Sequence, residues 1–202
     1  MNTDTPARQP DERLAGAMLA AASALSVLVM AHHPTSFDAA TLGNLVHGAL
    51  MILLLIVLAG FARFASGRGL QRFPVLAGLV FYAAAAFGNL LAATINGFAV
   101  PALAAREPAI SKDVFRFAWE LNQALAYAAV YAISLAFILW GADLVTRKRK
   151  VAGLAGLAAG AIPAALLATG AIDMHVAGAF IIYAMEAAFG VIIGVLMMRG
   201  RA

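Results

Sequence analysis

The sequence contains no cysteine, and only 12% of its 202 residues are charged. The absence of cysteine excludes disulfides and thiolate metal sites. An ordinary soluble domain is about 25% charged and about 45–50% apolar, whereas 63% of this chain is hydrophobic. A water-soluble fold of this size could not bury so much apolar surface and still present a polar exterior. We therefore expect an all-α integral membrane protein with the lipid bilayer as its solvent.

The chain also lacks a Gly-rich phosphate loop and the helical His spacings of common zinc enzymes. Its formal net charge is +4, but the cations lie in short clusters between apolar runs. No basic face interleaved with aromatic residues is present, so nucleic acid is excluded as a partner. Clusters of this kind are instead typical of membrane topology.

Six apolar stretches reach the length of roughly 20 residues that a membrane-spanning helix needs. They run from about Leu14 to Ala31, Leu45 to Phe64, Pro74 to Phe98, Phe117 to Val145, Val151 to Ile172 and Val176 to Met198. The pattern predicts one polytopic bundle of about six transmembrane helices over residues 14–198, with short tails at 1–13 and 199–202. No internal repeat is evident.

Lysine and arginine are distributed unequally between the two sides of this bundle. Eleven of the 14 cations lie in the two termini and in the segments that join the second stretch to the third and the fourth to the fifth. The alternate segments hold only Arg106, Lys112 and Arg116. The positive-inside rule therefore places both termini in the cytoplasm. In a bacterium the protein would lie in the inner membrane.

The first apolar stretch has a second interpretation, as a signal peptide. Small residues before His32 resemble a cleavage site, and cleavage would remove residues 1–31. The apolar run, however, is longer than the usual 7–15 residues, and acidic residues precede it. We expect it to be retained as a helix.

All four histidines are predicted on the outer side. His32 and His33 follow the first helix, His47 lies early in the second, and His175 opens the sixth beside Asp173. Imidazole at the end of a helix is a ligand for haem or for a divalent metal. We expect His47 and His175 to hold haem b, or the histidines with Asp173 to hold Zn or Cu. Interface histidines bonded to their neighbours are the alternative.

A polar stripe runs along the fourth helix at helical period, from Glu120 through Gln123 and Tyr127 to Tyr131. In a zinc site Glu120 would be the general base of a hydrolytic reaction. The stripe predicts either a cavity lining or hydrogen bonds between helices. Further candidates for lining an outward-facing cavity are Asn44, Asn89 and Asn96.

Glu186 follows His175 by eleven residues, which places it roughly 16 Å deeper on the same side of the last helix. An ionised group in hydrocarbon costs at least about 2.5–3.5 kcal/mol, so a carboxyl group here marks a functional site. It is a catalytic candidate together with Glu120. The alternative is a protonated acid that hydrogen-bonds Asn89 or Tyr127. Because the cytoplasmic halves offer little that is comparable, we expect them to be apolar and tightly packed.

Small residues dominate the fifth and sixth helices. Glycines such as Gly153, Gly156, Gly190 and Gly194 let helix backbones approach closely in lipid. Packing within the bundle explains them more simply than an oligomer interface. Trp119 and Trp140, near the two ends of the fourth helix, are expected to form an aromatic belt.

Three functions are consistent with these features. The first is a haem- or metal-binding membrane protein with redox or hydrolytic chemistry. The second is a proton-coupled transporter of a small solute that uses Glu186. The third is a structural or assembly subunit whose polar residues only hold the bundle together.

Overall fold

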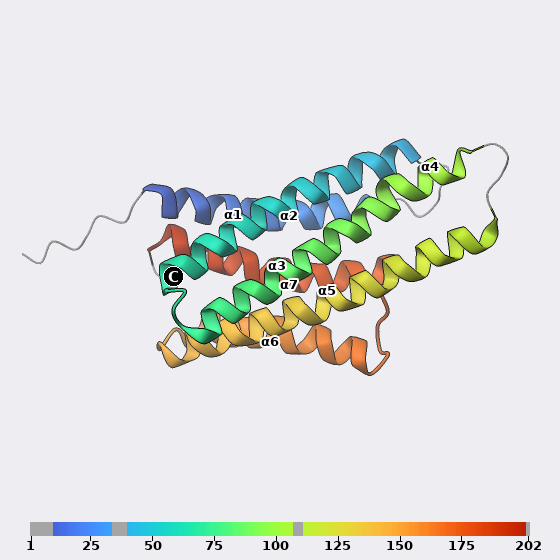
Figure 1. The fold of residues 1–202 in the computed structure, drawn as a ribbon. Coiled ribbons are helices and arrows are strands. Elements are labelled where there is room, and N and C mark those ends of the chain that lie inside the picture. Colours follow the sequence, from blue (N-terminus) through green and yellow to red (C-terminus); the bar gives the residue numbers. More distant parts are fainter. Residues whose placement is uncertain (1–9, 34–39, 107–110, 201–202) are drawn as a thin grey trace, which may run out of the picture.

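The computed structural model describes residues 10–33, 40–106 and 111–200, and the regular structure in these ranges is entirely helical (Figure 1). Its helices are α1 (Pro10–Met30), α2 (Ala40–Arg68), α3 (Phe73–Thr94), α4 (Val100–Ala104), α5 (Lys112–Thr146), α6 (Lys150–Ala168) and α7 (Val176–Met198). A π-helical turn, Ile95–Ala99, joins α3 to α4. Within the described ranges, six helical spans are long and apolar enough to cross a bilayer. The predicted all-helical fold, with six helices of membrane-spanning length and composition, is thereby confirmed.

Several helices extend beyond the apolar stretches that predicted them. The second continues to Arg68, past the predicted end at Phe64, and α5 begins at Lys112, before the predicted Phe117. Hydropathy detects only the part of a helix inside hydrocarbon, whereas the backbone hydrogen bonds continue into the interfacial region. The second helix also begins earlier than predicted, at Ala40 rather than Leu45. His47 therefore lies about two turns inside α2.

An aromatic cluster fills the core between α2, α3, α5 and α7. The ring of Phe61 stacks on Trp140 with centroids 5.1 Å apart, and Phe137 contacts Phe189 at 4.6 Å. Trp140 is fully buried, and its indole N–H donates to the carbonyl oxygen of Val75 at 3.2 Å. The expectation that Trp140 belongs to an aromatic belt is therefore wrong, because this side chain faces the bundle.

Glycines bring the helices into close contact. A Cβ atom at Gly160 of α6 would lie 2.5 Å from the carbonyl oxygen of Ser134 on α5. One at Gly194 of α7 would lie 2.5 Å from the carbonyl oxygen of Gly16 on α1. These contacts lie within the chain, and they pack α6 on α5 and α1 on α7.

The bundle has two ends. The end with His33 and His47, where α1 finishes and α2 and α5 begin, is called the histidine end. The opposite end, where α2 finishes at Arg68 and α3 begins, is called the arginine end. The first turn of α1 and the last turn of α7 both lie at the arginine end (Figure 1).

Candidate functional site

A cavity of about 230 Å³ lies between α1, α2, α3, α5 and α7 and is bordered by His33 and His47 at the histidine end. Its walls are mainly apolar, with aromatic rings of Phe61, Tyr82 and Phe137 at the inner part. Polar side chains line it at several depths: Ser23, Ser26, His33, His47, Asn89, Asn96, Asn122, Gln123, Tyr183 and Glu186. Ligand sites are typically apolar cavities with a few such polar groups.

Two histidines from different elements meet at the cavity. The Nε2 atoms of His33 and His47 are 3.2 Å apart, and the two rings pack edge to face. The Nδ1 atom of His47 lies 2.7 Å from the carbonyl oxygen of Gly43, one helical turn earlier. An N–H is required on Nδ1 for this bond, which leaves the lone pair of a neutral His47 on Nε2. His47 is buried, and His33 is half-buried.

Two hydrogen bonds join different segments of the cavity wall. The hydroxyl of Tyr183 on α7 donates to Oδ1 of Asn89 on α3 at 3.0 Å. The side-chain amide of Gln123 on α5 donates to the carbonyl oxygen of Met174 at 3.4 Å, just before α7 begins. Both bonds cross between helices, so these residues hold the wall together as well as lining it.

Glu186 lies at the inner part of the cavity, on the third turn of α7 and roughly 15 Å from the start of that helix. Its side chain is 7% exposed. Among the described residues no group hydrogen-bonds its Oε1 atom, and Oγ of Ser23, which also lines the cavity, has no such partner either. The partner suggested for a protonated Glu186, Asn89, uses its Oδ1 for Tyr183 instead.

The other predicted metal ligands lie outside the cavity lining. His175 is exposed and pairs with Asp173, with Nδ1 and Oδ2 2.8 Å apart, and its ring contacts Trp119. The backbone N–H of His175 donates to the same carboxylate, and together with the imidazole it lowers the pKa of Asp173. His32 is exposed and lies against the carbonyl oxygen of Leu28. The two histidines expected to hold haem therefore have different partners.

Four further candidates also do not line the cavity. Glu120, Asn44 and Tyr131 are exposed, and Tyr127 packs against a small apolar cluster beside the cavity. The polar stripe predicted on α5 therefore does not coincide with the face of the helix that is buried in the bundle. That face carries Asn122, Ala126, Ala129, Ile133, Phe137, Trp140 and Leu144.

Asn122 is a cavity residue that the sequence prediction omitted. The available signal was its position 15 and 18 residues before two large aromatic residues, Phe137 and Trp140, since both offsets fall close to one helical face. The prediction instead followed the polar residues alone, and these mark the neighbouring stripe that begins at Glu120. The prediction was therefore right about α5 as a wall of the site and wrong about part of its face.

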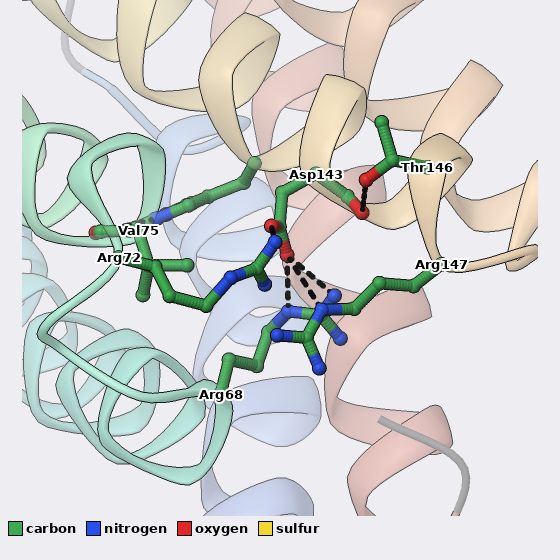
Figure 2. Close-up of polar contacts among 7 residues, drawn as sticks. Arg68, Arg72, Val75, Asp143, Thr146 and Arg147 are labelled. Atoms are coloured by element: carbon green, nitrogen blue, oxygen red, sulfur yellow. Dashed lines mark hydrogen bonds and ion pairs between the residues drawn. The ribbon is translucent and has the colours of Figure 1, made fainter.

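The arginine end holds a buried ionic cluster, built around Asp143 of α5 (Figure 2). Arg68 donates to Oδ2 of Asp143 from Nε at 2.9 Å and from its terminal nitrogen at 2.5 Å. Arg72 pairs with the other oxygen, and Nε of Arg147 lies 3.8 Å from Oδ2. The expectation of an apolar half at this end is wrong. The signal in the sequence was a carboxylate near the end of an apolar helix, one turn before Arg147.

The chain matches no protein-family model, no curated protein and no solved structure.

Proposed function

We propose that this protein is a proton-coupled membrane carrier for a small organic cation, which binds in the cavity with its charged group at Glu186. The observation that carries the proposal is the unpaired carboxyl oxygen of Glu186, nine-tenths buried at the inner part of a cavity. A buried carboxyl group without a partner in the protein has two low-energy states. It is either protonated and neutral, or ionised and paired with a bound cation. Exchange between these two states couples a proton to the solute.

The chemistry of the walls favours an organic cation. None of the described residues lining the cavity is lysine or arginine, so no protein cation competes for Glu186. The rings of Phe61, Tyr82 and Phe137 line the same region, and aromatic faces attract ammonium groups, most strongly where water is excluded. The volume of about 230 Å³ is below the roughly 300–1,000 Å³ of typical ligand pockets. We therefore expect a solute smaller than haem.

A carrier needs a barrier on one side of its site. The aromatic cluster around Phe61 and the ion pairs of Asp143 supply one at the arginine end. With both termini in the cytoplasm, as the cations predict, the cavity would open outward and this barrier would face the cytoplasm. The ion pairs join the α2–α3 turn to the end of α5, and they would have to rearrange for release.

The test of binding uses tetraethylammonium as the probe and tryptophan fluorescence as the readout, because Trp119 lines the cavity. The cation and a proton compete for one carboxylate, so affinity should rise with pH, by at most about tenfold per unit. The other titratable groups that line the cavity are Tyr82, Tyr183, His33 and His47. The variant Glu186→Gln should weaken binding by more than about tenfold and abolish proton release measured with an indicator dye.

The matched control is Glu120→Gln, which removes an exposed carboxylate outside the cavity lining and should bind as the wild type does. Transport follows in proteoliposomes, where an acidic interior should drive uptake of labelled tetraethylammonium in the wild type and in Glu120→Gln, but not in Glu186→Gln. A quaternary cation is used because it has no proton to lose and cannot cross lipid in a neutral form. Wild-type affinity in Glu186→Gln, or no binding by the wild type, would contradict the proposal and favour a structural subunit.

A further inference from the structure

The imidazole pair at the mouth of the cavity is a second site with its own chemistry. His33 comes from the chain just after α1, and His47 comes from the second turn of α2. Their Nε2 atoms lie 3.2 Å apart in a hydrogen bond at the cavity border. Because the lone pair of a neutral His47 is on Nε2, the shared proton belongs to Nε2 of His33, and a metal ion bound between the two nitrogens would displace that proton.

The protonation pattern of His47 suits a metal ligand. Its Nδ1 donates to the carbonyl oxygen of Gly43, so the lone pair of the neutral ring is on Nε2, towards His33. Metal-bound histidines almost always donate their other ring N–H to a carbonyl, carboxylate or water, which fixes the tautomer and the ring orientation. Gly43 performs this role here.

The side chain of His47 is also held in place by backbone packing. The π-helical turn Ile95–Ala99 places Gly97 directly against the Cβ atom of His47, with no room for a side chain between them. Asn96 of the same turn lines the cavity. Single π-helical turns are found frequently at functional sites. His47 is thus oriented both by a hydrogen bond and by backbone packing.

We propose that His33 and His47 bind a divalent transition-metal ion, Zn²⁺ in the first instance, at the mouth of the cavity. With Zn–N bonds of about 2.0–2.1 Å, a separation of 3.2 Å between the nitrogens corresponds to an N–Zn–N angle of roughly 100°, close to tetrahedral. Water or a solute in the cavity would complete the coordination. Two protein ligands make the ion exchangeable rather than structural.

The experiment uses metal alone on full-length protein purified in mild detergent and stripped with EDTA. Zn²⁺ binding is measured by calorimetry, and Co²⁺ is added separately because its visible absorption reports tetrahedral coordination. The variants are His33→Ala and His47→Ala, each checked for an unchanged helical spectrum. His33 lies beyond the end of α1 and is half-buried, so its variant tests the site even where His47→Ala fails to fold. The control is His175→Ala, whose imidazole lies at the same end but pairs with Asp173.

We expect one Zn²⁺ per chain in the wild type and in His175→Ala. Affinity should fall by more than about tenfold in His33→Ala and in His47→Ala, with loss of the Co²⁺ absorption. No metal uptake by the wild type would mean that the two imidazoles only hydrogen-bond each other, and this would overturn the proposal. Equal affinity in all variants, or loss in His175→Ala alone, would also overturn it. Tetraethylammonium binding tests the cation site at Glu186 separately from the metal site. Either proposal can therefore fail while the other holds.

Discussion

At the scale of single residues, two buried carboxyl groups have opposite surroundings. Asp143 is fully enclosed and pairs with Arg68 and Arg72, whereas no described residue hydrogen-bonds Oε1 of Glu186. A buried charge must be paired, or the group becomes neutral. The paired carboxylate therefore holds the fold, and the unpaired one is available to a proton or a ligand.

Asp143→Asn should destabilise the protein strongly. The substitution removes the negative charge and leaves the guanidinium of Arg68, 6% exposed in its side chain, buried without a counter-charge. Breaking a buried pair in this way costs about 3–5 kcal/mol in unfolding free energy. Denaturant unfolding in detergent, followed by circular dichroism, measures the change.

The matched control is Arg147→Gln. Its guanidinium is 45% exposed and its Nε lies 3.8 Å from Asp143, so the loss should stay below about 1 kcal/mol. Equal effects of the two substitutions would show that Asp143 is not the centre of the cluster.

At the scale of elements, α5 shows why a polar stripe is an unreliable guide in a membrane helix. The stripe through Glu120 and Tyr131 is exposed at both of these positions, while Asn122 and Phe137 face the bundle. In water a buried face is recognised by its apolar residues, but here lipid and protein interior are equally apolar. The sequence therefore predicted the helix and misjudged its rotation.

The π-helical turn supplies a prediction of its own. Gly97→Ala would place a methyl group on the Cβ atom of His47, so the turn or the imidazole must move. We expect the Zn²⁺ affinity to fall by about tenfold or more, as it does when the groups that orient a ligand are disturbed. Calorimetry on folded protein measures this.

Gly48→Ala is the matched control. A Cβ atom at Gly48 would meet its nearest neighbour, a ring carbon of Phe98, at an ordinary 3.8 Å. Zn²⁺ binding should be unchanged. Equal losses in both variants would assign the effect to α2 in general rather than to the support of His47.

At the scale of the whole molecule, the two ends of the bundle differ in their polar chemistry. The cavity extends to His33 and His47 at the histidine end, whereas aromatic rings and ion pairs fill the bundle towards the arginine end. Such an asymmetry suits a carrier with one side accessible and the other shut. Which side faces the cytoplasm follows from the cation distribution alone.

Orientation can be measured directly, since the chain has no cysteine of its own. We expect Gly67→Cys, exposed at the arginine end, to resist a membrane-impermeant maleimide added to intact cells. Ala105→Cys, exposed at the histidine end, should react. Permeabilised cells, in which both should react, are the control. The reverse pattern would turn the cavity towards the cytoplasm and contradict an outward-facing site.

The sequence by itself predicted a helical bundle with six helices long and apolar enough to span a membrane, because apolar length and the scarcity of charge leave few alternatives. It also identified Glu186, His33 and His47 as unusual, since polar groups in such a setting are costly. Residue type and depth therefore sufficed to select these three residues as candidates.

Only the tertiary structure decided which of these groups meet. His47 pairs with His33 rather than approaching His175, Asp143 gathers three arginines, and Asn122 replaces Glu120 in the cavity wall. These outcomes depend on how each helix is rotated and which helices are neighbours. Rotation is set by close packing of small residues such as Gly160 against Ser134, and hydropathy does not record that packing because both surroundings of the helix are apolar.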